Sequence, residues 1–285
     1  MDMNFSDAYV AYRKQLQEFL KGWPLTGDEA KLPEEEQERI FRERGIEAGY
    51  VYFEIPKEYG GAGQEPDVLK CGIIAEEYAR TGAPGNGIDQ GPGLLAPTLL
   101  EFGSEEQKRK FVPPTLRREV RWCQGYSEPG AGSDLASLQC AAVLDGDEWV
   151  INGQKIWTSF ATVADYCYLI GRTSTEGPPH RGVSEIIVPM DLPGIEVRSI
   201  TDMTTNAHFC EVYFTDVRVP IENLVGVEGD AFKQTMAQLE HERGGIDRLV
   251  SNKRLYDQAV AVADTDDPRV RQEIAQLEIG YRLGR

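Results

Sequence analysis

The 285-residue sequence contains no run of about eighteen apolar residues, so we expect no membrane-spanning helix. Its first residues have neither the basic start nor the apolar stretch of a secretory signal, which favours a cytoplasmic location. Only three histidines are present and no two cysteines are spaced Cys-x-x-Cys, so we expect no metal site. These absences favour a globular protein over a membrane, secreted or zinc-binding one.

Positive charge is also scarce. The chain has 30 lysines and arginines against 47 aspartates and glutamates, a formal net charge of −17. Nucleic-acid binding requires clustered positive charge, so a nucleic-acid partner is not expected. An anionic ligand would need local basic residues to overcome the overall repulsion.

Hydrophobic residues make up 41% of the chain, enough for a core in one large domain or two to three small ones. The five cysteines are odd in number, widely spaced and mostly set in apolar surroundings. This pattern predicts buried free thiols instead of a disulfide framework. The residues concerned are Cys71, Cys123, Cys140, Cys167 and Cys210.

Helical patterns dominate the first part of the chain. Apolar residues recur at helical spacing in residues 8–20, 68–78 and 94–102. Ser104 precedes a further helical segment, residues 105–116, and Gln107 follows it by three positions, the pattern of a capping box. We therefore predict an N-terminal helical domain over residues 1–119.

The pattern then changes to short strand-like segments separated by turns. These segments are residues 120–126, 138–143, 149–151, 155–158, 165–170, 183–188, 195–199 and 210–219. Asp145-Gly146 and Asn152-Gly153 each have the composition of a tight hairpin turn. Short strands at regular spacing predict a small β-barrel or sandwich domain over residues 120–228.

From residue 229 the helical spacing returns. Residues 232–250 predict one long helix, and residues 268–284 predict another. Two helices cannot bury their apolar faces alone, so residues 229–285 are expected to be the truncated start of a helical domain. Either the rest of a longer chain or a second subunit would complete this helical domain, and we favour the longer chain. The predicted fold class is therefore α+β multidomain, with an N-terminal helical bundle, a central barrel or sandwich and an incomplete C-terminal helical bundle.

The most informative stretch is YSEPGAGSD, residues 126–134. Gly130, Ala131 and Gly132 put no bulk between the backbone N–H groups and a ligand, so the loop could bind a pyrophosphate. Ser127 and Ser133 add hydroxyl groups on either side. Taken alone, the stretch is also typical of an ordinary turn.

Together with INGQKIWTS at residues 151–159, this stretch resembles the signature of the acyl-CoA dehydrogenase family of flavoenzymes. IPKEYGG at residues 55–61 and GSEEQK at residues 103–108 are also similar to family segments, so the resemblance covers nearly the whole chain. It implies an FAD-dependent oxidoreductase of lipid metabolism that forms an α,β double bond in an acyl-CoA thioester. It further implies electron-transfer flavoprotein as the electron acceptor, and a homo- or hetero-oligomer, a dimer or tetramer.

The resemblance also implies roles for single residues. The positions that match FAD-binding residues of the family are Tyr126, Ser127, Gly132, Ser133, Trp157, Thr158 and Ser159. Ser127 would contact the flavin ring, Trp157 would cover its edge and Ser159 would hydrogen-bond near N5. Ser133 would contact the pyrophosphate or the neighbouring substrate. Without the resemblance, Trp157 is more typical of a β-domain core.

The resemblance implies Glu242 as the base that removes the α-proton while a hydride passes to flavin N5. Arg243 matches an arginine that lies close to the substrate in the family, and Glu240 is a rival base on a different helix face. Charged residues at such positions are otherwise typical of a solvated helix surface. Other family members carry the base in a later loop, and that loop is absent from this sequence.

The sequence is also compatible with two alternative functions. One is a non-catalytic partner subunit of a heteromeric acyl-CoA dehydrogenase, and the other is a flavin-dependent monooxygenase on the same fold. The acyl group, whether straight, branched or a steroid side chain, does not follow from the sequence.

Overall fold

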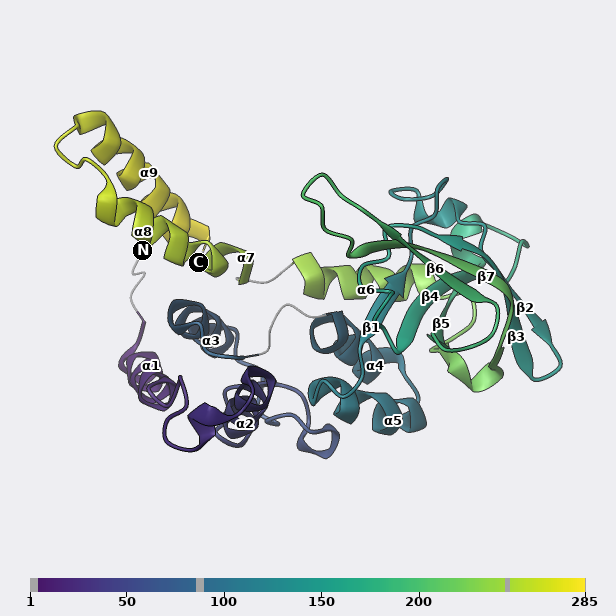
Figure 1. Cartoon of the computed structure of the whole chain (residues 1–285), viewed down its shortest axis with the longest axis horizontal. Helices are drawn as coiled ribbons and strands as arrows, with labels where there is room; N and C mark the ends of the chain where they lie inside the picture. Colours follow the sequence, from purple (N-terminus) through teal and green to yellow (C-terminus); the bar gives the residue numbers. More distant parts are fainter. Residues whose placement is uncertain (1–4, 86–89, 244–246, 285) are drawn as a thin grey trace. The chain divides into compact units, whose positions relative to one another are not determined.

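The computed structural model describes residues 5–85, 90–243 and 247–284, and Figure 1 shows the course of the chain. The chain divides into two compact units. One unit combines Met1–Gly87 with Gly244–Arg285, and the other comprises Ile88–Arg243. The N-terminal helices, the central sheet and the C-terminal helices confirm the predicted fold class.

All regular elements among the described residues of the first unit are helices. Its elements are α1 (Asp7–Leu20), η1 (Glu29–Lys31), α2 (Glu34–Glu47), η2 (Lys57–Tyr59), α3 (Val68–Thr81), α7 (Asp247–Ser251), α8 (Lys253–Val262) and α9 (Pro268–Gly284). α1 packs on α3, and Leu16 and Ile73 are fully buried on these two helices. The helices predicted at residues 8–20 and 68–78 are confirmed.

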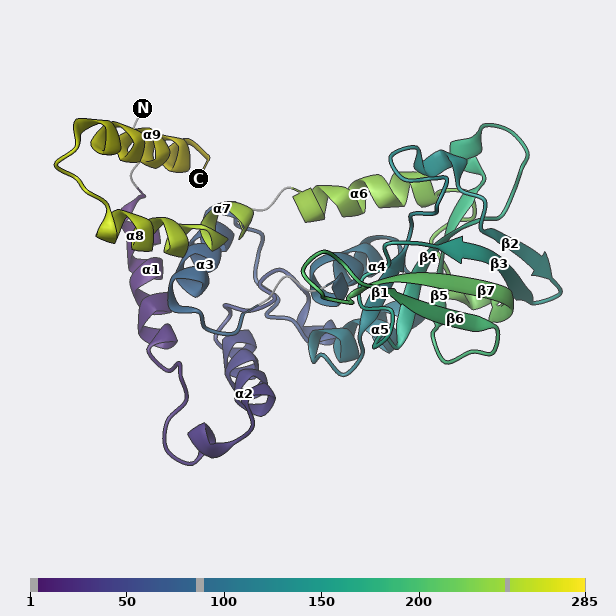
Figure 2. The same cartoon turned by 45° about the horizontal axis from the view of Figure 1, so that its top comes forward.

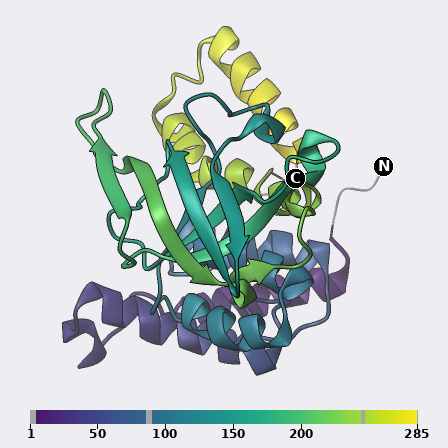
Figure 3. The same ribbon diagram turned by 90° about the vertical axis from the view of Figure 1, so that its right-hand side faces the viewer.

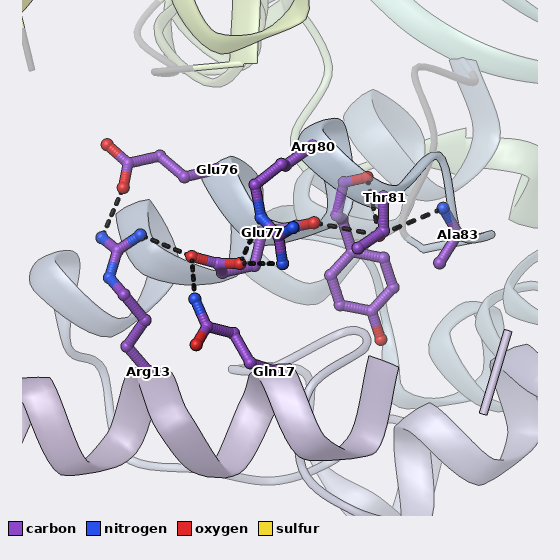
Figure 4. Close-up of polar contacts among 8 residues, drawn as sticks. Arg13, Gln17, Glu76, Glu77, Arg80, Thr81 and Ala83 are labelled. Atoms are coloured by element: carbon purple, nitrogen blue, oxygen red, sulfur yellow. Dashed lines mark hydrogen bonds and ion pairs between the residues drawn. The ribbon is translucent and has the colours of Figure 1, made fainter. Parts of the chain in front are cut away.

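A buried carboxylate joins α1 to α3 (Figure 4). Glu77 on α3 has a side chain only 3% exposed, and it accepts hydrogen bonds from Arg13 at 2.7 Å and Gln17 at 3.0 Å on α1. Arg80 adds another at 2.9 Å, and Arg13 also pairs with Glu76. Burial by itself would raise the pKa of Glu77, but the hydrogen bonds from Arg13, Arg80 and Gln17 bring it below its usual value.

Most of the predicted long helix over residues 232–250 is helical, in α6 (Ala231–Arg243) and α7, and residues 244–246 between them lie outside the described residues. No helix was predicted at α8, whereas α9 is confirmed. Figures 1 and 2 show α8 and α9 side by side, and the Tyr256 hydroxyl donates to the Ile274 carbonyl at 3.4 Å.

The helices of the second unit are η3 (Gly91–Leu95), a π-helical turn, α4 (Ala96–Phe102), α5 (Glu105–Leu116) and α6, with the short 3₁₀ turns η4 (Leu135–Ser137), η5 (Pro179–Arg181) and η6 (Ile221–Asn223). The predicted capping box at the start of α5 is confirmed. The Ser104 hydroxyl accepts from the Gln107 N–H, and the Gln107 side chain accepts from the Ser104 N–H. α6 packs on η3, α4 and strand β5.

The strands of this unit lie side by side in one curved sheet (Figure 3). They are β1 (Trp122–Gly125), β2 (Ala141–Asp145), β3 (Glu148–Lys155), β4 (Tyr166–Arg172), β5 (Val183–Pro189), β6 (Ile195–Ile200), β7 (Phe209–Pro220) and β8 (Leu224–Val225). The order is β6-β7-β3-β2-β4-β5-β8, and β1 pairs in parallel with β4. The Asp145-Gly146 hairpin is confirmed, since β2 and β3 pair antiparallel up to Asp145 and Glu148.

The second predicted hairpin, at Asn152-Gly153, is wrong. β3 continues through both residues, and its register with β7 shifts between Ile151 and Gly153. Gly153 has a φ of +152°, and a Cβ there would lie 2.6 Å from the Cys140 Cα. Glycine is therefore required by a bulge and a close approach of two strands, not by a turn.

The core of this unit lies between the sheet and its flanking segments, with Ile151, Val188 and Val212 fully buried. All five cysteines are free, and four of them are buried, which confirms the predicted thiols. Within residues 5–85, 90–243 and 247–284, no helix combines the length and the apolar character needed to cross a membrane.

Candidate functional site

The two sequence motifs meet in the second unit. The Ile156 N–H donates to the Ser127 carbonyl at 2.9 Å, so the segment after β3 lies against the segment after β1. Tyr126 and Ser127 are half-buried there, whereas Gly132 and Ser133 are exposed on the loop that follows. The fold thus joins the segments that carry the two motifs at one backbone contact.

A buried ion pair, which neither sequence motif predicts, holds the two motifs together. The Lys155 side chain is 0% exposed, and its ammonium group lies 2.8 Å from the Glu128 carboxylate and 3.0 Å from the Tyr126 carbonyl oxygen. Glu128 also accepts from the backbone N–H groups of Gln139 at 2.6 Å and Cys140 at 2.8 Å. A buried charge of each sign is tolerated because both are paired and hydrogen-bonded.

One signal in the sequence could have revealed Lys155. Side chains alternate between the two faces of a strand, and Trp149, Ile151 and Lys155 occupy the positions of β3 that are buried. A lysine in this row is expected to need an internal partner. The identity of that partner, Glu128, follows only from the fold.

The loop itself is a tight turn. The Glu128 N–H donates to the Ala131 carbonyl at 2.7 Å, and the Ala131 N–H donates back to the Glu128 carbonyl at 3.1 Å. Ala131 is buried, so it anchors the turn to the core. A Cβ on Gly130 or Gly132 would meet no atom within 4 Å, which leaves the backbone at both positions open to a ligand.

Trp157 does not belong to the core. Its side chain is 58% exposed, its φ is +60°, and its ring meets Phe209 edge-on at a centroid distance of 6.0 Å. The interpretation of Trp157 as a core residue is therefore wrong. A left-handed φ is uncommon for a bulky residue and indicates that the surroundings hold the backbone in place.

Hydrogen bonds to the start of β7 provide that restraint. The backbone groups of Thr158 and Cys210 exchange two hydrogen bonds of 3.0 Å, and the Phe160 N–H donates to the His208 carbonyl at 2.7 Å. Thr158 is buried, and its hydroxyl has no hydrogen-bond partner among the described residues. Ser159 is half-buried beside it.

The candidate base lies on the last turn of α6, since Glu242 and Arg243 are within its bounds. The side chains of Glu240, Glu242 and Arg243 lie outside the described part of the structure. Gln238, four residues before Glu242, is buried, and its Oε1 accepts a hydrogen bond from the Tyr126 hydroxyl. α6 is thus attached directly to the loop that carries the first motif.

These features suit a ligand with a planar ring and phosphate groups. An exposed indole can cover a ring edge, and the hydroxyl groups of Ser127, Thr158 and Ser159 can donate to ring heteroatoms. The open backbone at Gly130 and Gly132 permits a pyrophosphate to approach closely. The residues that are present therefore fit such a cofactor.

Two family descriptions match the chain. Residues 8–119 match "Acyl-CoA dehydrogenase, N-terminal domain", and residues 123–217 match "Acyl-CoA dehydrogenase, middle domain". A curated relative from Mycobacterium tuberculosis, acyl-CoA dehydrogenase IpdE1, is 41% identical over 88% of this chain. That alignment covers 66% of the relative, so the chain spans about two thirds of its length.

Solved structures are similar over the whole chain. The "Tcur3481-Tcur3483 steroid ACAD" is 34% identical with a TM-score of 0.78, and the match covers 100% of this chain and 76% of that one. The ChsE4-ChsE5 complex from Mycobacterium tuberculosis is 31% identical with a TM-score of 0.75, over 99% of this chain and 75% of that one.

Proposed function

This chain belongs to the acyl-CoA dehydrogenase family, and we propose that it supplies the flavin-binding surface and the base of an FAD-dependent acyl-CoA dehydrogenase. The reaction is α,β-dehydrogenation of an acyl-CoA thioester, with electron-transfer flavoprotein as the acceptor. A cytoplasmic location is part of the same proposal. Because the chain spans about two thirds of the length of IpdE1, the activity is proposed for the complete protein.

One observation carries the proposal: the contact between the loop after β1 and the segment after β3. The Ile156–Ser127 backbone hydrogen bond and the Lys155–Glu128 ion pair join the segments that carry Ser127 and Trp157, which supports a shared ligand surface. An ordinary turn would not require a buried lysine beneath it, because burying a charge carries a large desolvation cost.

FAD, if held by these residues, would supply the acceptor for the β-hydrogen of the substrate as a hydride. Trp157 would cover the edge of the ring, while Ser127 and Ser159 would hydrogen-bond to it. Gly132 and Ser133 would bind the pyrophosphate, and Ser133 or Arg243 would contact the substrate. Glu242 would take the α-proton onto its carboxylate, and exclusion of water by the acyl chain would raise the pKa of that carboxylate and make it a stronger base.

The base assignment is tested by Glu242→Gln in the complete protein. We expect FAD to remain bound, because the substitution leaves the β-domain surface intact, and we expect bleaching of the flavin by acyl-CoA to be abolished. Glu240→Gln is the matched control, with the same chemical change on another face of α6. If Glu242→Gln still bleached fully, or if bleaching were lost only in Glu240→Gln, Glu242 would not be the base.

Acyl-CoA esters are the probes for the substrate. One of the similar solved structures is that of a steroid ACAD, so CoA esters of steroid side chains are the first to try, followed by branched and straight chains. Stopped-flow flavin bleaching with each ester ranks them by rate. No bleaching with any ester by the complete protein would contradict the proposed activity.

A second candidate function is that of a partner subunit in a heteromeric dehydrogenase. A similar structure is a complex of ChsE4 with ChsE5, which favours this alternative. α8 contains no buried residue and α9 contains none among its described positions, which supports an oligomer or further helices as their cover. Copurification with a second subunit, and flavin bound only in that complex, would favour the partner role.

A further inference from the structure

Polar side chains, four of them buried and one half-buried, connect the sheet of the second unit to α6. The Tyr168 hydroxyl on β4 donates to the Glu185 carboxyl group on β5 at 2.5 Å, and the Thr235 hydroxyl on α6 donates to the same carboxyl group at 3.2 Å. The Tyr126 hydroxyl donates to Gln238 on α6. The rings of Tyr126 and Tyr168 lie 6.4 Å apart between centroids. We call these five residues the polar bridge.

The polar bridge is a costly arrangement. Glu185 is 0% exposed, Tyr168 and Thr235 are 1% exposed, and Gln238 is 2% exposed. Polar groups removed from water lower stability unless they are hydrogen-bonded, and apolar side chains of similar size would fill the same space without that risk. The hydroxyl groups of Tyr168 and Thr235 satisfy the Glu185 carboxyl group, and burial raises its pKa to about 8.

Tyr126 occupies a special position in this bridge. Its backbone carbonyl accepts from Lys155 at 3.0 Å beneath the loop, and its hydroxyl reaches Gln238 on the helix. Residues four apart on a helix lie one turn apart on the same face, so Gln238 is one turn from Glu242. One side chain therefore links the proposed flavin-binding loop to the helix that carries the proposed base.

We infer that Tyr126 is a positioning residue: its hydroxyl, through Gln238, holds the last turns of α6 in place relative to the flavin-binding loop. This inference rests on the proposed function, because it concerns the distance between base and cofactor. Proton abstraction depends steeply on such distances, and a misplacement of about 1 Å can lower a rate about 100-fold. The hydrogen bond from Tyr126 to Gln238 joins the loop directly to α6, so it sets the distance between base and cofactor more directly than packing through the sheet does.

The test is Tyr126→Phe in the complete protein. This change removes the hydroxyl and keeps both the ring and the backbone carbonyl that Lys155 binds. Tyr166→Phe is the matched control, because it makes the same chemical change on β4, in a tyrosine whose ring packs against Trp122 and Phe111. Both variants are measured for flavin content, for flavin bleaching by acyl-CoA and for amide hydrogen exchange in peptides from α6.

For Tyr126→Phe we expect normal flavin content, bleaching slowed about 10- to 100-fold and an almost unchanged KM. In the protein without cofactor, α6 amides should exchange roughly fivefold faster, the equivalent of one lost hydrogen bond. Tyr166→Phe should match the parent in every measurement. Unchanged bleaching and exchange in Tyr126→Phe would overturn the inference. The inference would also fail if Tyr126→Phe and Tyr166→Phe lost the same amount of kcat and the same amount of unfolding free energy.

Gln238→Leu provides an independent variant if Tyr126→Phe folds poorly, since it removes the same link from the helix side, together with a 3.5 Å hydrogen bond from the Gln124 side chain. The double variant Tyr126→Phe/Gln238→Leu should lose no more activity than Gln238→Leu alone, because both substitutions remove the shared Tyr126–Gln238 interaction. Additive losses would contradict the link. If the parent protein itself shows no bleaching, the proposed function fails, whereas the exchange measurement still decides whether Tyr126 holds α6.

Discussion

The ammonium group of Lys155 lies between the Tyr126 carbonyl oxygen and the Glu128 carboxylate, at 3.0 and 2.8 Å. This contact joins the end of β3 to the loop after β1, two segments about thirty positions apart in the sequence. It shapes the loop from beneath, while the backbone of Gly130 and Gly132 stays open above. A buried charge at this place makes the loop sensitive to any change in its partner.

Lys155→Met should therefore destabilise the second unit strongly. The substitution leaves the Glu128 carboxylate buried without its cation, and breaking a buried pair costs about 3–5 kcal/mol. Urea denaturation gives the free energy of unfolding. The exposed Lys31, which pairs with Asp28, is the control, and Lys31→Met should change stability by less than about 1 kcal/mol. Equal effects of the two substitutions would show that burial of the pair is unimportant.

Gly132→Ala separates folding from ligand binding. Gly132 does not have a left-handed φ and a Cβ there would meet no atom within 4 Å, so the fold itself does not need glycine. We expect unchanged or slightly higher stability, by up to about 1 kcal/mol, and a clear loss of bound FAD. Gly153→Ala should instead destabilise the protein, by about 1–3 kcal/mol, since its Cβ would strike Cys140. Normal FAD content in Gly132→Ala would argue against a close pyrophosphate.

Glu185→Gln should change how stability depends on pH. The pKa of Glu185 is about 8 in the folded protein against an ordinary value of 4.5, because burial disfavours the anion. As the pH rises, the unfolded chain therefore loses this proton at a lower pH than the folded protein does. The contribution of protonated Glu185 to the stability of the fold is complete below about pH 4.5 and is lost as the pH rises to about 8. The variant should equal the parent at low pH and be more stable by a few kcal/mol above about pH 8.

Urea midpoints measured across this pH range test the Glu185 prediction. Glu211→Gln is a suitable comparison, since this half-buried glutamate on β7 hydrogen-bonds to Tyr213 at 3.1 Å near the surface. Parallel pH profiles for the parent and Glu185→Gln would contradict a neutral carboxyl group at this position.

Arg13→Met should weaken the junction of α1 and α3. Glu77 would keep Arg80 and Gln17 but lose one charged partner, so we expect a loss of about 1–3 kcal/mol. The hydrogen bonds that lower the pKa of Glu77 stabilise the fold above the unfolded pKa, and this contribution is lost as the pH falls through the folded pKa. The variant should accordingly unfold at a higher pH in acid titration followed by circular dichroism.

Arg39→Met is the control for this prediction. Arg39 pairs with Glu36 and Glu43 on the exposed face of α2, where water screens the charges, and its loss should change stability little. A loss in Arg13→Met no larger than in Arg39→Met would show that the buried cluster contributes no more than a surface pair.

Local patterns predicted the elements whose stabilising contacts are local. The capping box at Ser104 and the Asp145-Gly146 turn depend on residues within a few positions of one another. Asn152-Gly153 carries the same hairpin composition, but the Asn152 side chain bonds to Asp216, 64 positions away, and β3 continues. The local preference was overridden by strand pairing with β7.

The candidate site, too, was predictable only where its features are local in the sequence. The residue types of the loop and of Trp157 to Ser159 are visible in the sequence, since their chemistry does not depend on neighbours. The strand alternation marks Lys155 as a buried position, but only the fold shows that Glu128 is its partner. The backbone bonds between Thr158 and Cys210, beside the exposed Trp157, likewise join segments about fifty positions apart.

By itself, then, the sequence established the order of helices, strands and helices, the free thiols and the resemblance carried by YSEPGAGSD and KIWTS. Periodicity and short motifs encode these properties within a few residues. Only the tertiary structure decided that a buried lysine supports the loop, that Gly153 forms a bulge and that Tyr126 reaches Gln238. Each of these is a contact between distant segments, and burial makes its energy depend on partners that no local pattern names.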